Sequence, residues 1–467
     1  MWLIEKDDSE LPVRDGRERC EGEVQRLRGV ILVYVDDMMI TGETGLANTV
    51  VKELQKVWQT SEPEGIEEGK PTKFLGMEIE KKGESIKASQ TSFIKDRLMM
   101  NLGEDWMRAK GSSTPCSRDI GEVEDEKEIT PEEVREAERI VGELLWWVTR
   151  SRIDLMYVTS RLSQMVLRAP RAVYRASKQV WAYLKKTSSP GLIFTPDAGE
   201  GWAGESEVGL QAYSDASFAP GGGHSIGAVV IKWNGSPMMW RAGKQPFPTL
   251  SAAEAELTEA TEAMLMGDAF DALLTDLFAD YPKSLLVDNM AAIQLITEES
   301  GAWRTRHLRV RSHHLRWRFS RLDWRALPCP GAVMPADLGT KPLTAARLDE
   351  LKVISVMTTE TAEEAVQEPK TEITEETIKE VLKMLLVACL VQVTKGQGGG
   401  DGEAPHGRRE DDTAMWMAIA LYTFLIVVAV NAFQWVFSTW RTVAEMRADY
   451  EKAASTRGTD FWPLRDT

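Results

Sequence analysis

The chain has 467 residues, 43% of them hydrophobic, which is enough for two or three domains with apolar cores. Its formal net charge of −16 excludes a protein that binds nucleic acid through a general basic character, so any such surface must be local. Four scattered cysteines without metal-ligand spacing argue against zinc and a disulfide framework and indicate a reducing compartment; they are Cys20, Cys116, Cys329 and Cys389. The opening residues, MWLIEKDDSELPVRDG, are too charged for a signal sequence.

The first predicted element is a β-hairpin over residues 29–41, GVILVYVDDMMIT. Apolar runs flank Asp36 and Asp37 on both sides, so both carboxylates are expected at the exposed tip of a tight turn. An ordinary solvated Asp-Asp turn is the alternative reading of these letters.

An acidic stretch follows at residues 121–139, GEVEDEKEITPEEVREAER. Thr130 and Pro131 are typical of a helix start, and Glu132 and Glu133 favour the first turn because the helix dipole is positive there. We therefore expect a solvated linker that leads into a helix.

Four carboxylates then stand in four separate contexts; they are Asp215, Glu256, Asp288 and Asp337. The first lies in an apolar alternation, LQAYSDASF, which predicts a strand beside an antiparallel partner, SIGAVVIKW. The second lies on the first turns of a helix predicted from Ser251 toward Leu277. The third closes the short apolar run SLLV, and the fourth lies in VMPADLGTKPL. This order predicts a mixed sheet that gathers carboxylates at one edge.

Crowded carboxylates cannot all stay ionised without cations, and such a cluster suits Mg²⁺ or Mn²⁺. Two such ions can clamp the attacking water and the leaving oxygen of a phosphodiester. Coincidence is the alternative, because 72 acidic residues place Asp and Glu in many patterns.

The stretch 304–325 reverses the sign of the charge locally, with one acid, Asp323, among eleven basic or titratable side chains. These are Arg304, Arg306, His307, Arg309, Arg311, His313, His314, Arg316, Arg318, Arg321 and Arg325. Such a cluster predicts a phosphate-binding surface, and a solvated helix face is the alternative. The interleaved Trp303, Trp317 and Trp324 can stack on bases or pack in the core.

Beyond residue 351 the composition changes. Residues 358–380 are acidic and poor in aromatics, which predicts an extended or transiently helical linker. Residues 414–437, AMWMAIALYTFLIVVAVNAFQWVF, carry no charge and have Trp near both ends, which predicts a single transmembrane helix. A buried apolar helix is the alternative. Basic residues flank this segment on both sides, so they do not set its orientation.

Longer strings resemble copia-type LTR retrotransposon Pol polyproteins over most of residues 20–350. The strings YSDASFA, SIGAVVIKWNGSPMMWRAGKQ, LSAAEAELTEA, VDNMAAI, RTRHLRVRSHHLRWRF and ADLGTKPL resemble the RNase H domain of that family. YVDD and KFLGMEIEKKGESIKASQTSFIKDRLMMNLG resemble the reverse-transcriptase palm, and two segments between residues 141 and 194 resemble its thumb and connection.

The RNase H resemblance implies a catalytic metal site formed by Asp215, Glu256, Asp288 and Asp337. It implies that Asp215 bridges two Mg²⁺ ions, that the other three complete the shells, and that bound water attacks. Glu254 is the alternative to Glu256, but helical residues two apart cannot face one site, and the family's register favours Glu256. Ser217 stands where the family often has a second acid.

The palm resemblance implies that Asp36 and Asp37 are metal ligands. Such a polymerase also needs a third Asp on an upstream strand, and only 35 residues precede Asp36, without an apolar strand that carries one. A truncated palm that cannot polymerise DNA alone is therefore expected. A polymerase completed by another chain is disfavoured, because the palm core would be split between chains.

We therefore predict an α/β protein in six parts. These are a truncated palm at 1–110, a helical thumb- or connection-like region at 111–203, an RNase H-like mixed sheet with flanking helices at 204–350, a disordered acidic and glycine-rich linker at 351–412, a transmembrane helix at 413–440 and a polar tail at 441–467. The predicted activity is hydrolysis of the RNA strand of RNA–DNA hybrids in a single-pass membrane protein. The hybrid is expected to contact Arg304, Arg306, His307, Arg309, Arg311, His313, His314, Arg316 and Arg318. The alternative is a catalytically silent, membrane-tethered retroelement remnant that binds nucleic acid or a partner.

Overall fold

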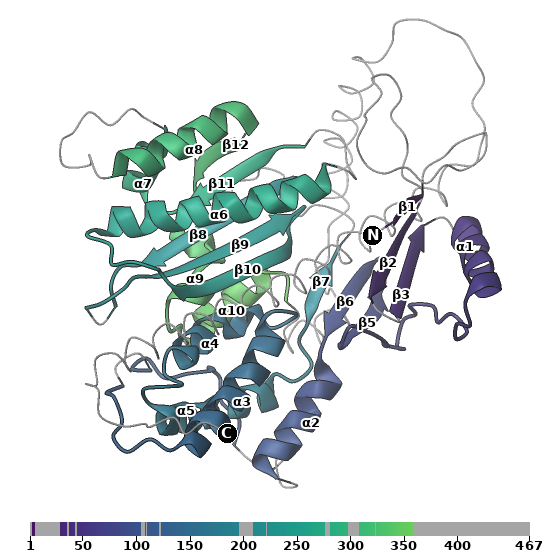
Figure 1. The fold of residues 1–467 in the computed structure, drawn as a ribbon, viewed down its shortest axis with the longest axis horizontal. Helices are drawn as coiled ribbons and strands as arrows, with labels where there is room; N and C mark the ends of the chain where they lie inside the picture. The colour runs from purple at the N-terminus through teal and green to yellow at the C-terminus, as the bar shows by residue number, and fades with distance from the viewer. Residues whose placement is uncertain are drawn as a thin grey trace, which may run out of the picture.

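The computed structural model describes residues 2–4, 29–34, 37–42, 44–103, 108, 110–120, 123–195, 209–220, 222–275, 281–297, 308–322 and 324–357. These residues form a mixed α/β structure with three sheets (Figure 1), which confirms the predicted α/β class. The linker, transmembrane helix and tail predicted beyond residue 357 lie outside the described residues. Within the described part of the chain, every helix is too short or too polar to cross a bilayer.

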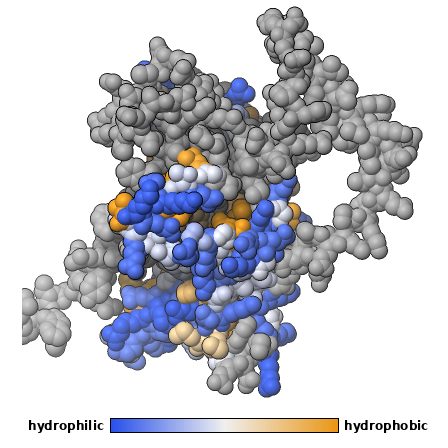
Figure 2. All heavy atoms as spheres, turned by 90° about the vertical axis from the view of Figure 1, so that its right-hand side faces the viewer, coloured by the Kyte–Doolittle hydropathy of each residue, from blue (hydrophilic) through white to orange (hydrophobic). Residues whose placement is uncertain are grey.

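The N-terminal sheet consists of β1 (Trp2–Ile4), β2 (Gly29–Tyr34) and β3 (Asp37–Gly42), followed by α1 (Thr44–Val57). Tyr34 pairs with Asp37 in antiparallel register, so the predicted hairpin is confirmed. Asp37 is exposed at its tip, and Asp36 lies outside the described residues. Figure 2 shows this side of the molecule, where the coloured atoms are mainly hydrophilic and apolar atoms form small separate patches.

A second sheet joins distant parts of the chain. Its strands are β4 (Thr72–Phe74), β5 (Met77–Lys82), β6 (Ser85–Ser89) and β7 (Leu192–Phe194), and α2 (Thr91–Leu102) follows the third of them. All neighbouring strands pair antiparallel, in the order β4-β5-β6-β7. The Ile193 N–H donates to the Val356 carbonyl at 2.9 Å, so the end of the described chain also meets this sheet.

The helical region contains α3 (Pro131–Val148), the 3₁₀ turn η2 (Ile153–Leu155), α4 (Met156–Ser163) and α5 (Pro170–Lys186). The predicted helix start at Pro131 is confirmed, and Thr130 is its N-cap. The Thr130 hydroxyl accepts from the Glu133 N–H at 3.3 Å, and the Glu133 carboxylate accepts from the Thr130 N–H at 3.0 Å. This capping box satisfies two backbone donors that the helix itself leaves free.

The largest sheet holds five strands: β8 (Leu210–Ser217), β9 (Ile226–Trp233), β10 (Ser236–Lys244), β11 (Lys283–Val287) and β12 (Trp324–Pro328). Their order is β10-β9-β8-β11-β12, and β11 runs parallel to both of its neighbours. The predicted antiparallel pair of β8 and β9 is confirmed. Strand β10 was not predicted, although Asn234 and Gly235 form a typical hairpin turn before it.

Helices cover both faces of this sheet. They are α6 (Ala252–Leu274), α7 (Met290–Thr297), α8 (Arg309–Leu322), α9 (Asp337–Thr340) and α10 (Ala345–Ile354), with the 3₁₀ turn η4 (Gly331–Val333) before α9. On β9, Gly227 lies against Glu259 of α6, whereas its neighbour Ala228 lies against Gly339 of α9. Successive strand residues face opposite sides, so α6 and α9 lie on opposite faces of the sheet (Figure 1).

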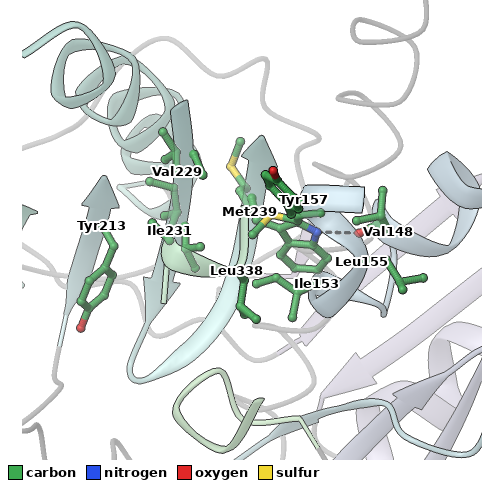
Figure 3. Packing of buried hydrophobic residues seen from close by; sticks show 14 of the residues in the cluster. Val148, Ile153, Leu155, Tyr157, Tyr213, Val229, Ile231, Met239 and Leu338 are labelled. Atoms are coloured by element: carbon green, nitrogen blue, oxygen red, sulfur yellow. Dashed lines mark hydrogen bonds between the residues drawn. The ribbon is translucent and has the colours of Figure 1, made fainter. Parts of the chain in front are cut away.

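One apolar core connects the helical region to the five-stranded sheet. Figure 3 shows Val148, Ile153 and Leu155 packed close to Met239 and Leu338. A buried hydrogen bond joins the same two parts, because the Trp240 indole Nε1 donates to the Val148 carbonyl at 2.6 Å. Separating residues 111–203 from 204–350 would expose this interface, so either part alone would lose packing that the full chain has.

Replacing glycine by alanine should have opposite effects on stability at two helical positions, 267 and 142. A Cβ at Gly267 would lie 2.5 Å from the ring of Trp324, which is buried and donates to Asp268 at 3.1 Å. We therefore expect Gly267→Ala to destabilise the protein by about 1–3 kcal/mol through overpacking. Gly142 is exposed on α3, and apart from its chain neighbours and the backbone of its own helix no atom lies within 4 Å of its Cβ position. Gly142→Ala should instead stabilise by up to about 1 kcal/mol.

Urea denaturation followed by circular dichroism measures both changes in the full chain. A Gly267→Ala variant at least as stable as the wild type would contradict the packing of α6 against Trp324.

Candidate active site

Three of the four predicted carboxylates converge at one edge of the five-stranded sheet. Asp215 lies near the end of β8, and Asp288 directly follows β11, which runs parallel to β8. Parallel strands end at the same edge of a sheet, so this pairing brings the two carboxylates together. Glu256 reaches them from α6. One carboxylate oxygen from each residue lies within 4.8 Å of the other two.

The first turn of α6 decides which glutamate faces this group. Ser251 is the N-cap, and its hydroxyl accepts from the Glu254 N–H at 3.1 Å. The Glu254 carboxylate accepts from the Leu250 N–H at 2.7 Å, which keeps this side chain at the helix start. Glu256, two residues later, lies on a different face of the helix and joins Asp215 and Asp288.

The local environment disfavours three anions in the absence of a cation. Burial raises the pKa of Asp215 to about 6. Burial, with repulsion from Asp215 and Asp288, raises the pKa of Glu256 to about 9. Burial also raises the pKa of Asp288, although Lys341 opposes this effect, and repulsion from Asp337 adds a smaller increase. A bound cation would favour the ionised form of each group.

One oxygen of the group lacks a partner. Glu256 is 5% exposed, and its Oε2 accepts no hydrogen bond. The carboxylate receives the Ala216 backbone N–H. Most buried polar atoms in folded proteins are hydrogen-bonded, and what distinguishes this unpartnered oxygen is that it lies beside two further carboxylates, which suits a ligand position. Hard carboxylate oxygens fit Mg²⁺ or Mn²⁺.

The fourth predicted carboxylate, Asp337, begins α9 and faces two cationic side chains. Lys341 Nζ lies 2.5 Å from its Oδ1, and Arg347 Nη2 lies 3.4 Å from its Oδ2. Lys341 Nζ also lies 3.3 Å from Asp215 Oδ2, which accepts a hydrogen bond from the Thr340 hydroxyl. The structure therefore places Asp337 beside the three-carboxylate group, with Lys341 between it and Asp215.

Thr340, Lys341 and Arg347 were not among the residues predicted for the site. Thr340 and Lys341 lie three and four residues after Asp337, in the same string, ADLGTKPL. Residues at these spacings lie on one side of a helix, so the spacing could have indicated that Thr340 and Lys341 face the same site as Asp337.

Helix α8 carries part of the predicted nucleic-acid surface. Arg304, Arg306 and His307 lie outside the described residues, as does the side chain of Arg309. Arg311 lies over the Phe247 ring, with its guanidinium carbon 4.6 Å from the centroid. Arg316 donates to the Leu295 carbonyl at 3.2 Å, and Arg318 pairs with Asp268. Through these contacts the three arginines hold α8 against the rest of the protein.

A different part of α8 is open to solvent. His313 and Arg321 are exposed, and His314 is half-buried. Trp317 is 48% exposed, with the Arg321 guanidinium carbon 5.3 Å from its ring centroid. Trp324, by contrast, is buried. The exposed aromatic and cationic pair of Trp317 and Arg321 thus belongs to the surface of α8.

Comparison with known proteins identifies the family, although no family model matches the chain. The chain is 27% identical over 299 residues to the Retrovirus-related Pol polyprotein from transposon RE2 of Arabidopsis thaliana, which is 62% of this chain and 19% of that protein. It is 26% identical over 326 residues to the corresponding polyprotein from transposon TNT 1-94 of Nicotiana tabacum; these residues are 67% of this chain and 23% of that protein. It is 30% identical over 251 residues to a putative transposon Ty5-1 protein of Saccharomyces cerevisiae; these residues are 50% of this chain and 72% of that protein.

The chain spans about a fifth of the length of the two plant polyproteins that it matches. The similarity extends over about 60% of the chain, and the predicted relationship to retrotransposons is confirmed. The chain belongs to the copia-type, retrotransposon-related Pol family.

Proposed function

We propose that this protein is a metal-dependent nuclease of the RNase H type, which hydrolyses the RNA strand of RNA–DNA hybrids. The observation that carries the proposal is the convergence of Asp215, Glu256 and Asp288, with one buried glutamate oxygen left without a partner. The RNase H resemblance implies a mixed sheet with flanking helices, and the five-stranded mixed sheet with helices on both faces supports the proposal. The retrotransposon relatives support it further.

The three carboxylates would hold Mg²⁺ or Mn²⁺. When bound, such an ion activates water and stabilises the negative charge that develops on the phosphodiester. The chain itself orients the ligands, because the Thr340 hydroxyl donates to Asp215 and the Ala216 N–H donates to Glu256. Carboxylates held in this way need little rearrangement to bind a cation, which favours tight and specific coordination.

The substrate would be recognised by the shape of the hybrid, its phosphates and its 2′-hydroxyl groups. The exposed pair of Trp317 and Arg321 on α8 offers a stacking surface and a cation to such a strand. Since neither group reads base edges in this mode, cleavage should depend weakly on sequence.

The proposal is tested with the full chain and three duplexes of one sequence: RNA–DNA, RNA–RNA and DNA–DNA, with each strand labelled in turn. We expect cleavage of the RNA strand of the hybrid in Mg²⁺ or Mn²⁺ and none in EDTA. Failure to cut the hybrid with either ion, or equal cutting of all three duplexes, would contradict an RNase H-type activity.

The α8 surface gives a separate prediction. Arg321→Gln should weaken hybrid binding to a similar extent for every sequence and reduce the salt dependence of the affinity by about one phosphate contact. Fluorescence anisotropy in EDTA at several salt concentrations measures this without cleavage. Arg135→Gln removes the same charge from the exposed surface of α3 and should leave binding unchanged. Equal affinities for wild type and Arg321→Gln would remove this arginine from the interface.

One observation favours a second candidate, a protein that binds nucleic acid without cutting it. Asp337 is engaged with Lys341 and Arg347, so fewer carboxylates face one another than the RNase H resemblance implies. Hybrid binding by the full chain, together with no cleavage in Mg²⁺ or Mn²⁺, would select this candidate.

A further inference from the structure

Lys341 contacts two carboxylates that the resemblance assigns to a shared pair of cations. Its Nζ lies 2.5 Å from Asp337 Oδ1, 3.3 Å from Asp215 Oδ2 and 3.5 Å from Asp215 Oδ1. A single ammonium group therefore bridges the two side chains. Arg347 supplies a second positive charge on the far oxygen of Asp337.

Asp215 divides the site into two cation positions. On one side it groups with Glu256 and Asp288, where a buried glutamate oxygen accepts no hydrogen bond. On the other side it meets Lys341, which also contacts Asp337. Lys341 contacts both carboxylates of the second position, whereas in the first position it contacts Asp215 and acts on Asp288 and Glu256 only through longer-range attraction.

The electrostatics keep the second position filled. Lys341 Nζ lies 2.5 Å from an oxygen of Asp337 and 3.3 Å from an oxygen of Asp215, and opposite charges attract at such distances. A lysine side chain carries a positive charge at neutral pH. A divalent cation that entered between Asp215 and Asp337 would have to displace this ammonium group, because like charges repel at such short range.

We propose that Lys341 takes the place of a second divalent cation in the substrate-free protein. The free site then binds one Mg²⁺ or Mn²⁺ ion, between Asp215, Glu256 and Asp288. This inference rests on the proposed function for the identity of the ion, but it concerns how many ions bind and not whether RNA is cut.

Titration of the full chain with Mn²⁺, without nucleic acid, tests the number of ions. Electron paramagnetic resonance reports the free ion, so the bound ions follow by difference. Surface acids also bind Mn²⁺ weakly, so each protein is compared with a version that also carries Asp215→Asn, which removes both positions. We expect this difference to be one ion for the wild type and two for Lys341→Gln.

Three further variants make the assignment specific. Lys341→Arg keeps a cation at this place and should bind one ion. Adding Asp337→Asn to Lys341→Gln should remove the second ion, which locates it at Asp337. Lys244→Gln makes the same charge change at an exposed residue that ends β10 and should match the wild type.

Two results would overturn the proposal: a wild type that binds two ions with affinities within about tenfold, or a folded Lys341→Gln variant that still binds one. Circular dichroism establishes that each variant is folded. If Lys341→Gln does not fold, the wild-type count alone decides, since two ions would contradict the proposal and one would support it. A protein that binds one ion but does not cut hybrids would leave this inference standing and remove the proposed function.

Discussion

The Asp288→Asn variant is expected to lose RNA cleavage by about 10³-fold and to become more stable in the absence of metal. An amide cannot supply the negative charge that holds a divalent cation, so the metal-dependent step is lost. The same change removes an anion whose charge helps to raise the pKa of both Asp215 and Glu256, so ionising Asp215 then costs less. Relief of such repulsion at a functional site commonly stabilises a protein by about 0.5–2 kcal/mol.

Two measurements on the full chain check this pair of effects: the rate of cleavage of a labelled hybrid in Mg²⁺, and the midpoint of thermal unfolding in EDTA. Asp96→Asn, at an exposed position of α2, removes the same charge elsewhere and should change neither quantity. Cleavage by Asp288→Asn at the wild-type rate would exclude this carboxylate from the chemistry. A lower unfolding midpoint would show that the Asp288 carboxylate stabilises the fold, which contradicts the expected repulsion among these carboxylates.

Arg152→Met should produce the largest loss of stability, about 3–5 kcal/mol. Arg152 and Asp154 form a fully buried ion pair, with Nη2 2.7 Å from Oδ2. Arg152 also donates to the Thr187 carbonyl at 2.7 Å, and the Tyr183 hydroxyl donates to Asp154 at 2.6 Å. Methionine fills similar space without the charge, so the variant leaves a buried carboxylate without its main partner.

The pH dependence of this loss distinguishes an electrostatic cause from a packing defect. Burial acts to raise the pKa of Asp154, but Arg152 outweighs it and holds the pKa below its ordinary value. This pair therefore stabilises the wild type above the ordinary carboxylate pKa, and the contribution is lost as the pH falls through the native pKa. In Arg152→Met the arginine no longer opposes burial, so the pKa of Asp154 rises and the carboxyl group binds a proton more readily. The stability difference between the two proteins should shrink as the pH falls from 7 toward 4.

Urea denaturation at several pH values tests this expectation. Arg135→Met breaks an exposed pair with Glu132 on α3 and should change stability by less than about 0.5 kcal/mol at any of them. A difference between Arg152→Met and wild type that is independent of pH would mean that lost packing, and not the buried charge, sets the effect.

Features that depend on neighbouring residues followed from the sequence. The hairpin of β2 and β3, the N-cap at Thr130 and the helix start at Ser251 all appear where the sequence predicts them. In each case the side chain or turn residue acts within a few positions of itself, so local chemistry determines the structure. The separation of Glu254 from Glu256 has the same origin, since helical geometry alone places them on different faces.

Features that depend on contacts between residues far apart in the chain could not be predicted from the sequence. Strand β12 lies directly after an arginine-rich helix, and its pairing with β11 gives it a role that its own short sequence does not reveal. The contacts of Arg316 and Arg318 on α8 depend on Leu295 and Asp268, which are remote in the sequence. A charge pattern shows which residues are cationic, but only the fold shows which of them are already paired.

The position of Lys341 is the clearest example of such a contact. It lies 126 residues from Asp215 in the chain, and the two meet only because α9 packs against the face of the sheet opposite α6. The RNase H resemblance implies that four carboxylates share two ions, whereas the structure groups three and places an ammonium beside the fourth. Charge balance, which residue types alone do not reveal, thus shapes the candidate site.

The most direct test of the central claim compares two glutamates that lie two residues apart on α6. Glu256 belongs to the carboxylate group, whereas Glu254 caps the helix start. The measurement is cleavage of the labelled RNA strand of a hybrid in Mg²⁺ by the wild type, Glu256→Gln and Glu254→Gln. We expect the wild type and Glu254→Gln to cut and Glu256→Gln to be inactive while it remains folded. Cleavage by Glu256→Gln at the wild-type rate, or no cleavage by the wild type, would contradict a nuclease site at this edge of the sheet.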